Sequence, residues 1–206
     1  EIIFVNNGST DGTDREIDKM KLKYGERIVK VVVPVNKGFG WGIMNGFNVC
    51  RGTFIGFTAG NLQVDPIEIV RIYDRTRTNF GTVAKAYRRV RHDGMIRGVL
   101  SYFYNRLFRL LFQTDIKDVN GTPKIFPARF LRPLNLRSKG SFFDTELLIK
   151  LAYLDCAISE VPIEYKKRSF GKSSVKFPLI FEMFWGLIRF RFGDEFRYWK
   201  DCMVMI

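Results

Sequence analysis

The stretch EIIFVNNGSTDGT, residues 1–13, joins a short apolar run to a polar turn. Residues 1–5 are apolar on both faces, which is typical of a buried parallel strand. Ser9, Asp11 and Thr13 are residue types that begin helices, and residues 14–24 have the pattern of the helix that follows. A buried strand, a polar turn and a helix in this order predict an α/β fold.

The alternation of strand and helix continues through residue 87. We expect strands over residues 28–35, 53–58 and 82–87, and helices over residues 43–51 and 67–79. Polar or glycine-rich loops follow the first three strands, over residues 6–13, 36–42 and 59–66. Sheets of this kind carry helices on both faces and bind ligands at the carboxyl ends of their strands. The sequence therefore predicts a mostly parallel sheet with a nucleotide-type ligand at these loops.

From residue 88 onward the sequence becomes more basic and more aromatic. We expect helices over residues 96–112, 143–154 and 177–192, a turn and a strand within 118–126, a strand over 158–165 and a basic loop over 166–174. Neither a repeat nor a low-complexity linker divides the chain, so both halves are expected to belong to one domain.

The chain has 206 residues and a formal net charge of +13, and the basic residues are unevenly distributed. Residues 84–206 hold 23 basic and 12 acidic side chains, whereas residues 1–83 hold 11 and 9. Such a basic half suits nucleic acid, a phosphorylated substrate or an anionic membrane surface, or it is an ordinary solvated surface. The 46% of apolar residues exclude a disordered chain, and three scattered cysteines are too few for a disulfide framework or a zinc site. No run of about 18 apolar residues occurs, so no membrane-spanning helix is expected.

Six motifs in a fixed order carry a resemblance that extends over nearly the whole chain. They are Val5–Thr13, Asn36-Lys37-Gly38 with Gly40, Asn61-Leu62-Gln63 with Asp65-Pro66, Arg97 with Ser101 and Asn105, Phe143-Asp144-Thr145-Glu146, and Val161-Pro162 with Arg168, Gly171 and Ser173. Together they resemble family 2 glycosyltransferases, specifically the polyprenyl-phosphate branch that is similar to dolichyl-phosphate mannosyltransferase. Any one of these motifs is weak evidence, whereas six in the right order are strong.

The resemblance implies the GT-A fold, a Rossmann-like α/β fold that binds a nucleotide-diphosphate sugar. Residues 1–176 would form this domain, with a nucleotide-sugar part over 1–87 and an acceptor part over 88–176. The implied reaction transfers a sugar from a UDP- or GDP-sugar to a polyprenyl (dolichyl-type) phosphate or a related glycan-lipid acceptor, with inversion and with Mg²⁺ or Mn²⁺. A phosphate acceptor is already ionised at neutral pH, so a single histidine is consistent with this chemistry. The resemblance also implies that one more strand precedes residue 1 and lies centrally in the sheet.

The resemblance further implies roles for individual residues. The donor-binding residues would be Asn6, Asn7, Gly8, Ser9, Asp11, Lys37, Gly38, Gly60 and Arg88. The acceptor-binding residues would be Asp144, Glu146, Arg168, Lys172 and Ser173. The catalytic residues would be Asn61, Gln63 and Arg97, and Asn61 and Gln63 would also be weak metal ligands. For Asp144 and Glu146, the alternative is that they are charges that stabilise the amino terminus of a helix.

Arginines are expected at the phosphate groups because a guanidinium binds phosphate in a bidentate manner. Arg88, Arg91 and Arg97 are the candidates, and the alternative for each is a solvated surface side chain. Asp118 either orients these arginines or caps a turn.

Two departures from the family pattern concern the donor site. The family's D-x-D becomes Ala59-Gly60-Asn61, so both of its aspartates are replaced. Asn61 and Gln63 can still offer carbonyl oxygens to Mg²⁺ or Mn²⁺, and Asp65 is a nearby carboxylate, but weak or absent metal binding is an equal alternative. The family's paired aspartates after the first strand become Asn6-Asn7, whose amides can still form hydrogen bonds with a base.

Residues 177–206 would form an amphipathic helix at the carboxyl end of the chain. Trp185 and other aromatic residues, with Arg189 and Arg191 near the end, suit a membrane interface, and packing into the core is the alternative. A lipid acceptor favours the interface. The protein is then expected in the cytoplasm, peripheral at the inner face of the membrane.

Functions of three classes stay open at this point. The first is an active glycosyltransferase. The second is a catalytically impaired homologue that binds a sugar nucleotide or a partner, which the changed D-x-D favours. The third is nucleic-acid binding driven by the net charge, but the chain lacks the aromatic and basic motifs of the usual modules. We therefore expect a nucleotide-sugar donor, a lipid-phosphate acceptor and a membrane surface as partners, and no nucleic acid.

Overall fold

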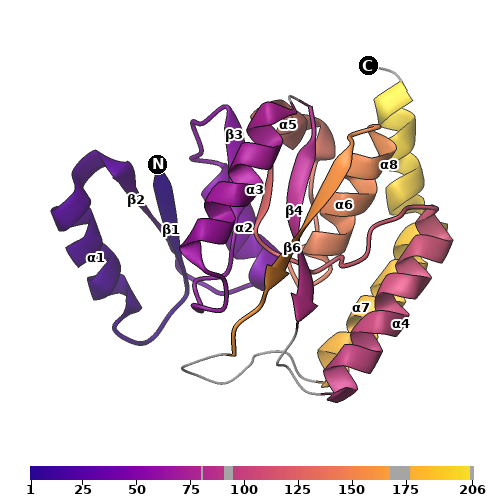
Figure 1. Cartoon of the computed structure of the whole chain (residues 1–206), viewed down its shortest axis with the longest axis horizontal. Helices are drawn as coiled ribbons and strands as arrows, with labels where there is room; N and C mark the ends of the chain where they lie inside the picture. Colours follow the sequence, from indigo (N-terminus) through magenta and orange to yellow (C-terminus); the bar gives the residue numbers. More distant parts are fainter. Residues whose placement is uncertain (80, 91–94, 168–176, 205–206) are drawn as a thin grey trace.

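The computed structural model describes residues 1–79, 81–90, 95–167 and 177–204 (Figure 1). Its strands are β1 (Ile2–Asn7), β2 (Ile28–Val33), β3 (Phe54–Phe57), β4 (Val83–Val90), β5 (Lys124–Pro127) and β6 (Ile158–Glu164). Its α-helices are α1 (Thr13–Tyr24), α2 (Phe39–Phe47), α3 (Pro66–Thr78), α4 (Met95–Phe112), α5 (Leu131–Leu134), α6 (Phe143–Tyr153), α7 (Phe177–Phe192) and α8 (Asp194–Val204). Short 3₁₀ turns, Gly25–Arg27 and Ala128–Phe130, precede β2 and α5. The predicted α/β fold is confirmed.

The strands form two sheets rather than the single sheet that the sequence predicts. β1 and β2 pair in parallel, and the other four strands follow the order β3-β5-β4-β6. β4 and β6 are parallel, whereas β5 runs antiparallel to both β3 and β4. Helices cover both faces, and Figure 1 shows α3 in front of the four-stranded sheet and α6 behind it. The expected strand before residue 1 stays a prediction.

The direction of β5 follows from the loop that precedes it. After α4, residues 113–123 lead the chain back to β4, where Ala86 donates its amide to the carbonyl of Pro123 at 2.8 Å. The chain therefore enters the sheet beside the first half of β4 and runs in the opposite direction. This antiparallel register places Lys85 opposite Lys124.

Two glycines allow α2 to pack closely on β1. A Cβ at Gly46 would lie 2.9 Å from Cγ2 of Val5, and one at Gly42 would lie 3.0 Å from Nδ2 of Asn7. The glycine-rich sequence of this helix therefore brings the loop before it, residues 34–38, to the carboxyl end of β1.

The buried helix α6 forms the centre of the molecule. Every side chain from Phe143 to Leu151 is buried. The rings of Phe47 and Phe57 contact Phe143 and one another, and Phe47 also contacts Phe126, in mostly edge-to-face pairs with centroids 5.7–6.3 Å apart. Burial of each such ring stabilises the fold by about 1.5–3 kcal/mol, so this cluster fixes α6 against α2 and the sheet.

The predicted helix over residues 177–192 is confirmed as α7, and a separate helix, α8, follows it where the sequence predicts one amphipathic helix that continues to residue 206. The chain turns at Gly193, whose amide donates to the carbonyl of Arg189 at 2.7 Å, and a Cβ there would lie 2.4 Å from that carbonyl. In α8 both Phe196 and Trp199 are buried, and Trp199 Nε1 donates to the carbonyl of Pro133 at 2.9 Å. The α8 helix therefore packs into the core. Within the described ranges, no helix combines the length and the hydropathy needed to cross a membrane.

Candidate active site

A cavity of about 810 Å³ lies where the loops after β1 and β2 meet α4, α6 and α7. Its volume is within the range of small-molecule sites. Six residues that the sequence predicts for the donor, catalytic or acceptor sites line it: Asn7, Lys37, Gly38, Arg88, Arg97 and Asp144. The carboxyl ends of β1 and β4 therefore supply the site, as expected for an α/β sheet.

The loop after β2 is held to the end of β1 by the amide of Asn7. Its Nδ2 donates to Oδ1 of Asn36 at 3.2 Å and to the carbonyl of Gly38 at 3.0 Å. Its Oδ1 is buried and has no hydrogen-bond partner among the described residues. Because an unpaired buried acceptor is costly, this oxygen is suited to accept a hydrogen bond from an N–H group of a ligand.

Glycine is required at position 38 of the same loop. Its φ of +121° is in the range that favours glycine, and a Cβ would lie 2.5 Å from the carbonyl of Lys139. Lys37 lies beside it, with Nζ 5.3 Å from the ring centroid of Trp41, and the Nζ of Lys139 lies 5.2 Å from the same centroid. Lys37 therefore adds a positive charge to the cavity wall beside Gly38.

Four predicted donor-binding residues shape the turn after β1 and do not line the cavity. Asn6 is buried, donates from Nδ2 to Asp14 at 2.9 Å and accepts the Ser9 amide at 3.0 Å. Gly8 has a φ of +70°, and a Cβ there would lie 2.8 Å from the amide nitrogen of Asn36. Ser9 and Asp11 are exposed, and hydrogen bonds from Thr13 lower the pKa of the Asp11 carboxyl.

Arg88 is held at the end of β4 by Asp118. Its Nε and Nη2 each lie 2.7 Å from a different carboxylate oxygen of Asp118, and its backbone amide donates to the same carboxylate at 3.1 Å. Asp118 also accepts the Gly121 amide with its carbonyl, so it both orients the arginine and stabilises a turn. Arg97 reaches the same cavity from α4. Arg91 lies outside the described residues.

The segment that replaces D-x-D does not line the cavity. Asn61 donates from Nδ2 to Oε1 of Gln63 at 2.8 Å and accepts the Gln63 amide at 3.2 Å. Gln63 is buried and donates from Nε2 to the carbonyl of Lys166 at 3.1 Å. Gly60 is exposed. These side chains tie the loop to the end of β6.

The same residues do not fit a divalent cation. The side-chain oxygens of Asn61 and Gln63 accept hydrogen bonds within the pair, and neither carries a charge. Asp65 lies 2.8 Å from Nζ of Lys166 and caps α3, and these two contacts lower the pKa of its carboxyl. Across the described ranges, no cluster of three or more His, Cys, Asp or Glu could hold a metal.

Two of the five predicted acceptor-binding residues, Asp144 and Glu146, lie in the described part of the structure. Asp144 lines the cavity, and its Oδ1 lies 2.5 Å from Nζ of the buried Lys124. Glu146 is fully buried, accepts the amides of Arg137 and Ser138 at 2.7–3.2 Å, and pairs with Lys150. It therefore holds a loop and does not line the cavity. The other three predictions, Arg168, Lys172 and Ser173, lie outside the described residues.

Several cavity residues escape prediction from the sequence. Asn120, Ser141 and Glu182 line the cavity. Lys124 does not line it but contacts Asp144, which does. The one available signal was a lysine at the start of the otherwise apolar KIFP strand, which is unusual for a strand at the centre of a sheet.

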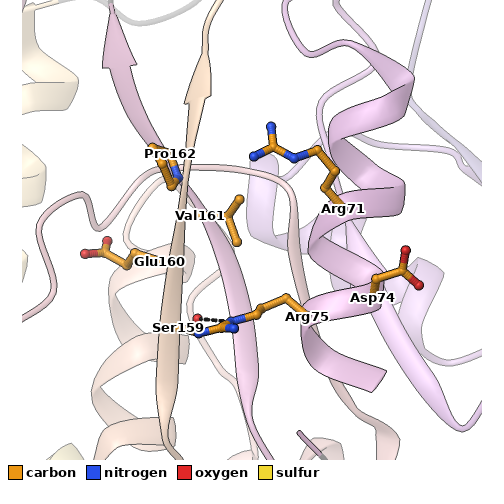
Figure 2. A pocket seen from close by; sticks show the side chains of 7 residues that line it. All are labelled: Arg71, Asp74, Arg75, Ser159, Glu160, Val161 and Pro162. Carbon is orange, nitrogen blue, oxygen red and sulfur yellow. Dashed lines mark hydrogen bonds between the residues drawn. The ribbon is translucent and has the colours of Figure 1, made fainter. Parts of the chain in front are cut away.

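A second cavity of about 450 Å³ lies between α3 and β6 (Figure 2). Figure 2 shows Arg71 and Arg75 from α3 beside Ser159 and Val161 of β6, with Nε of Arg75 donating to Oγ of Ser159 at 3.0 Å. None of the predicted site residues lines this cavity, and it lies beside the first half of β6. It is therefore not the candidate active site.

Comparisons with known proteins identify the family and the fold of the chain. A family model described as Glycosyl transferase family 2 matches residues 1–132. Undecaprenyl-phosphate 4-deoxy-4-formamido-L-arabinose transferase from Klebsiella pneumoniae (strain 342) is 24% identical over 189 residues, which are 91% of this chain and 56% of that protein. The chain thus spans little more than half the length of this relative.

Solved structures show the same fold. Glucosyl-3-phosphoglycerate synthase from Mycobacterium tuberculosis, in complex with Mn²⁺, uridine diphosphate and glucosyl-3-phosphoglycerate, superposes with a TM-score of 0.72 at 16% identity, over 93% of this chain and 68% of that one. Its complex with Mn²⁺, uridine diphosphate and phosphoglyceric acid gives a TM-score of 0.73 at 15% identity, over 93% and 67%. The fold is GT-A, as the resemblance implies. Because the family model covers well over half of the sequence, the chain belongs to glycosyl transferase family 2.

Proposed function

We propose that the large cavity binds a UDP- or GDP-sugar and that the protein transfers the sugar to a polyprenyl phosphate. The observation that carries this proposal is the convergence of Lys37, Arg88 and Arg97 on one cavity beside the unpartnered acceptor of Asn7. Cations of this kind bind a diphosphate, and an amide oxygen accepts the ring N–H of uracil or guanine. The similarity to an undecaprenyl-phosphate sugar transferase supports the class of acceptor.

The proposed chemistry needs charge stabilisation more than proton transfer. The diphosphate leaving group gains negative charge as the glycosidic bond breaks, and a fixed cation stabilises that charge without reorganising. Arg88 is such a cation because Asp118 fixes its guanidinium at two nitrogens. A phosphate acceptor is already an anion, so it attacks the anomeric carbon from the opposite side without a strong base. Inversion is the expected stereochemical outcome.

A transfer assay tests the proposal. The chain is incubated with radiolabelled UDP- or GDP-sugars and undecaprenyl phosphate, with and without Mn²⁺, and the organic extract is counted. Lipid-linked sugar is the expected product. Nucleotide binding without transfer from any donor would instead support a donor-binding homologue that lacks turnover, a function that the hydrogen-bonded Asn61 and Gln63 amides favour.

Restoring a carboxylate at Asn61 is expected to create a metal site. In Asn61→Asp, the affinity for Mn²⁺ should rise by about tenfold or more, because a charged oxygen replaces an amide. Electron paramagnetic resonance of free Mn²⁺ measures this directly. Asn79→Asp, at the end of α3, is the matched control and should leave Mn²⁺ binding at the wild-type level. Equal Mn²⁺ affinity in wild type and Asn61→Asp would contradict the expectation.

We further propose that α7 lies on the membrane that holds the acceptor. Phe181, Trp185 and Phe192 are 73%, 64% and 64% exposed on this helix, which ends with Arg189 and Arg191. Figure 1 places α7 beside α4, which adds exposed apolar residues, Tyr102, Phe103 and Leu110, to this part of the molecule. Aromatic side chains followed by arginines suit the interface of an anionic bilayer.

Replacing Trp185 with aspartate is expected to weaken membrane binding by about tenfold or more, because an exposed aromatic anchor is replaced by a charge that anionic lipids repel. Sedimentation with vesicles of equal parts phosphatidylglycerol and phosphatidylcholine measures the bound fraction. Tyr24→Asp, on α1 at the other side of the molecule, is the matched control and should bind as wild type does. Unchanged vesicle binding of Trp185→Asp would remove α7 from the proposed interface.

A further inference from the structure

Buried charges form a cluster beneath the large cavity. Lys85 and Lys124 lie opposite one another on β4 and β5, and both side chains are fully buried. Three carboxylates surround them, from Glu160 on β6, Asp144 on α6 and Asp118 in the loop before β5. Lysine is almost never fully buried unless it is paired, so a cluster of this kind needs a reason.

The two buried lysines have different partners. Nζ of Lys124 lies 2.5 Å from Oδ1 of Asp144 and 5.4 Å from the ring centroid of Phe57. Nζ of Lys85 lies 2.9 Å from Oε1 of Glu160 and also donates to the carbonyl of Asp118. Each buried ammonium group therefore forms an ion pair with a carboxylate.

Glu160 completes the connection to the loop that carries Asp118. Its Oε2 accepts the amide of Lys117 at 2.8 Å, and its Oε1 accepts the amide of Asp118 at 3.1 Å. The loop is thus fixed to β4 and β6 from two sides, and the Asp118 carboxylate in turn fixes the Arg88 guanidinium.

Both ends of the cluster reach the cavity. Asp144 lines it at one end and Arg88 lines it at the other. Neither buried lysine lines the cavity. Lys124 instead holds Asp144, and Lys85 holds the loop of Asp118, whose carboxylate fixes Arg88. A carboxylate at the cavity wall accepts a hydrogen bond from a hydroxyl group, which the sugar and a singly ionised acceptor phosphate both carry.

We propose that Lys124 is a positioning residue for sugar transfer, which holds Asp144 as a fixed carboxylate at the cavity wall, and that Lys85 holds the loop of Asp118, and through it Arg88, at the other end of the cavity. This inference rests on the proposed function, since it assigns Asp144 to a hydroxyl group of the sugar or of the acceptor. Lys85 and Lys124 are neighbours on β4 and β5, so the Arg88 side and the Asp144 side of the cavity are held by the same pair of strands.

The ionisation of Lys124 makes the proposal testable by pH. The groups that face its ammonium are Asp144 from α6, Lys85 from β4, Asp118 from the loop and the Phe57 ring from β3. Burial, opposed by Asp144 and reinforced by Lys85, lowers the pKa of Lys124 from 10.5 to about 8. Above that pH the buried ammonium loses its proton, and Asp144 loses its counter-charge.

The ionisation of Lys124 does not itself destabilise the fold in the same pH range. Between about pH 8 and 10.5 the unfolded chain binds more protons at Lys124 than the folded chain does. The contribution of this group to the free energy of unfolding therefore increases with pH across that window. A fall in the transfer rate between about pH 8 and 10.5 is therefore not caused by unfolding that is linked to Lys124.

The experiment compares pH profiles of kcat/KM for Lys124→Arg and for the wild type. The wild-type profile should fall above about pH 8, and the Lys124→Arg profile should fall at a pH about one unit higher or more, because a guanidinium stays protonated. Lys150→Arg, in the other buried pair of α6, is the matched control and should keep the wild-type profile. If the KM for the donor rises along the alkaline limb of the wild-type profile, Asp144 is assigned to the sugar. If the KM for the acceptor rises there instead, Asp144 is assigned to the phosphate. An alkaline limb that stays in place in Lys124→Arg would overturn the proposal.

Nuclear magnetic resonance separates this proposal from the proposed function and from misfolding of the variant. The ¹³C signal of the Asp144 carboxyl, assigned with Asp144→Asn, should shift near pH 8 in the wild-type protein as Lys124 loses its proton. A wild type that shows this shift but transfers no sugar would contradict only the proposed function. A carboxyl signal that is constant from pH 7 to 10 would overturn the positioning role.

Discussion

Replacing Arg88 with methionine is expected to lower kcat/KM for sugar transfer by about 100-fold or more, which is the typical cost of removing one fixed group that stabilises developing charge. Arg88 lines the cavity, and both of its bonded nitrogens are aligned by Asp118. Steady-state kinetics with a radiolabelled donor measure the change. The nucleotide dissociation constant should rise less than kcat/KM falls, because the charge to be stabilised is largest in the transition state.

Two further variants make this result interpretable. Arg88→Lys keeps the charge opposite the buried Asp118 but loses the bidentate contact, so it should fold and still transfer sugar much more slowly than the wild type. Arg71→Met removes a half-exposed arginine from α3 at the second cavity and should retain wild-type kinetics. Transfer by Arg88→Met within about threefold of the wild-type rate would contradict a role for this arginine at the leaving group.

Replacing Glu146 with alanine is expected to lower the free energy of unfolding by about 3–5 kcal/mol, the usual cost of breaking a buried ion pair at one partner. Glu146 and Lys150 are 0% and 1% exposed, and the carboxylate also accepts the amides of Arg137 and Ser138. Urea denaturation at constant pH measures the loss. Glu16→Ala, at an exposed pair on α1, should leave the midpoint nearly unchanged.

The double variant Glu146→Leu/Lys150→Met decides between a structural and an acceptor-binding role. Replacing both charges with apolar groups removes the unpaired buried ion, so stability should recover relative to Glu146→Ala. If Glu146 contacted the acceptor, the double variant would fold but would show a strongly raised KM for the acceptor. We expect it to show a KM near the wild-type value.

The alternation of apolar strands and polar loops is enough to predict the first half of the fold. The positions of β1, β2 and β3 follow from β-branched and aromatic runs, and Pro66 marks the start of α3. The same pattern does not reveal the direction of β5, because that direction depends on where a loop returns in space. Nor does it reveal α8 as a separate helix, because the direction that the chain takes after Gly193 depends on where Phe196 and Trp199 can be buried.

Side-chain direction limits the prediction of the site. Asp144 and Glu146 share one motif, but residues two apart on a helix point away from one another. Asp144 therefore faces the cavity while Glu146 faces the loop at 137–138. Buried lysines are missed for a related reason, since composition counts Lys85 and Lys124 with the solvated charges although both lie in the core.

A crystal structure of the protein with UDP or GDP tests the central claim most directly, because it locates the nucleotide without relying on turnover. We predict that the base donates a ring N–H to Oδ1 of Asn7 and that the diphosphate lies against Arg88 in the cavity of about 810 Å³. A nucleotide bound instead between Arg71 and Arg75 in the cavity beside β6, with the large cavity unchanged, would contradict the claim.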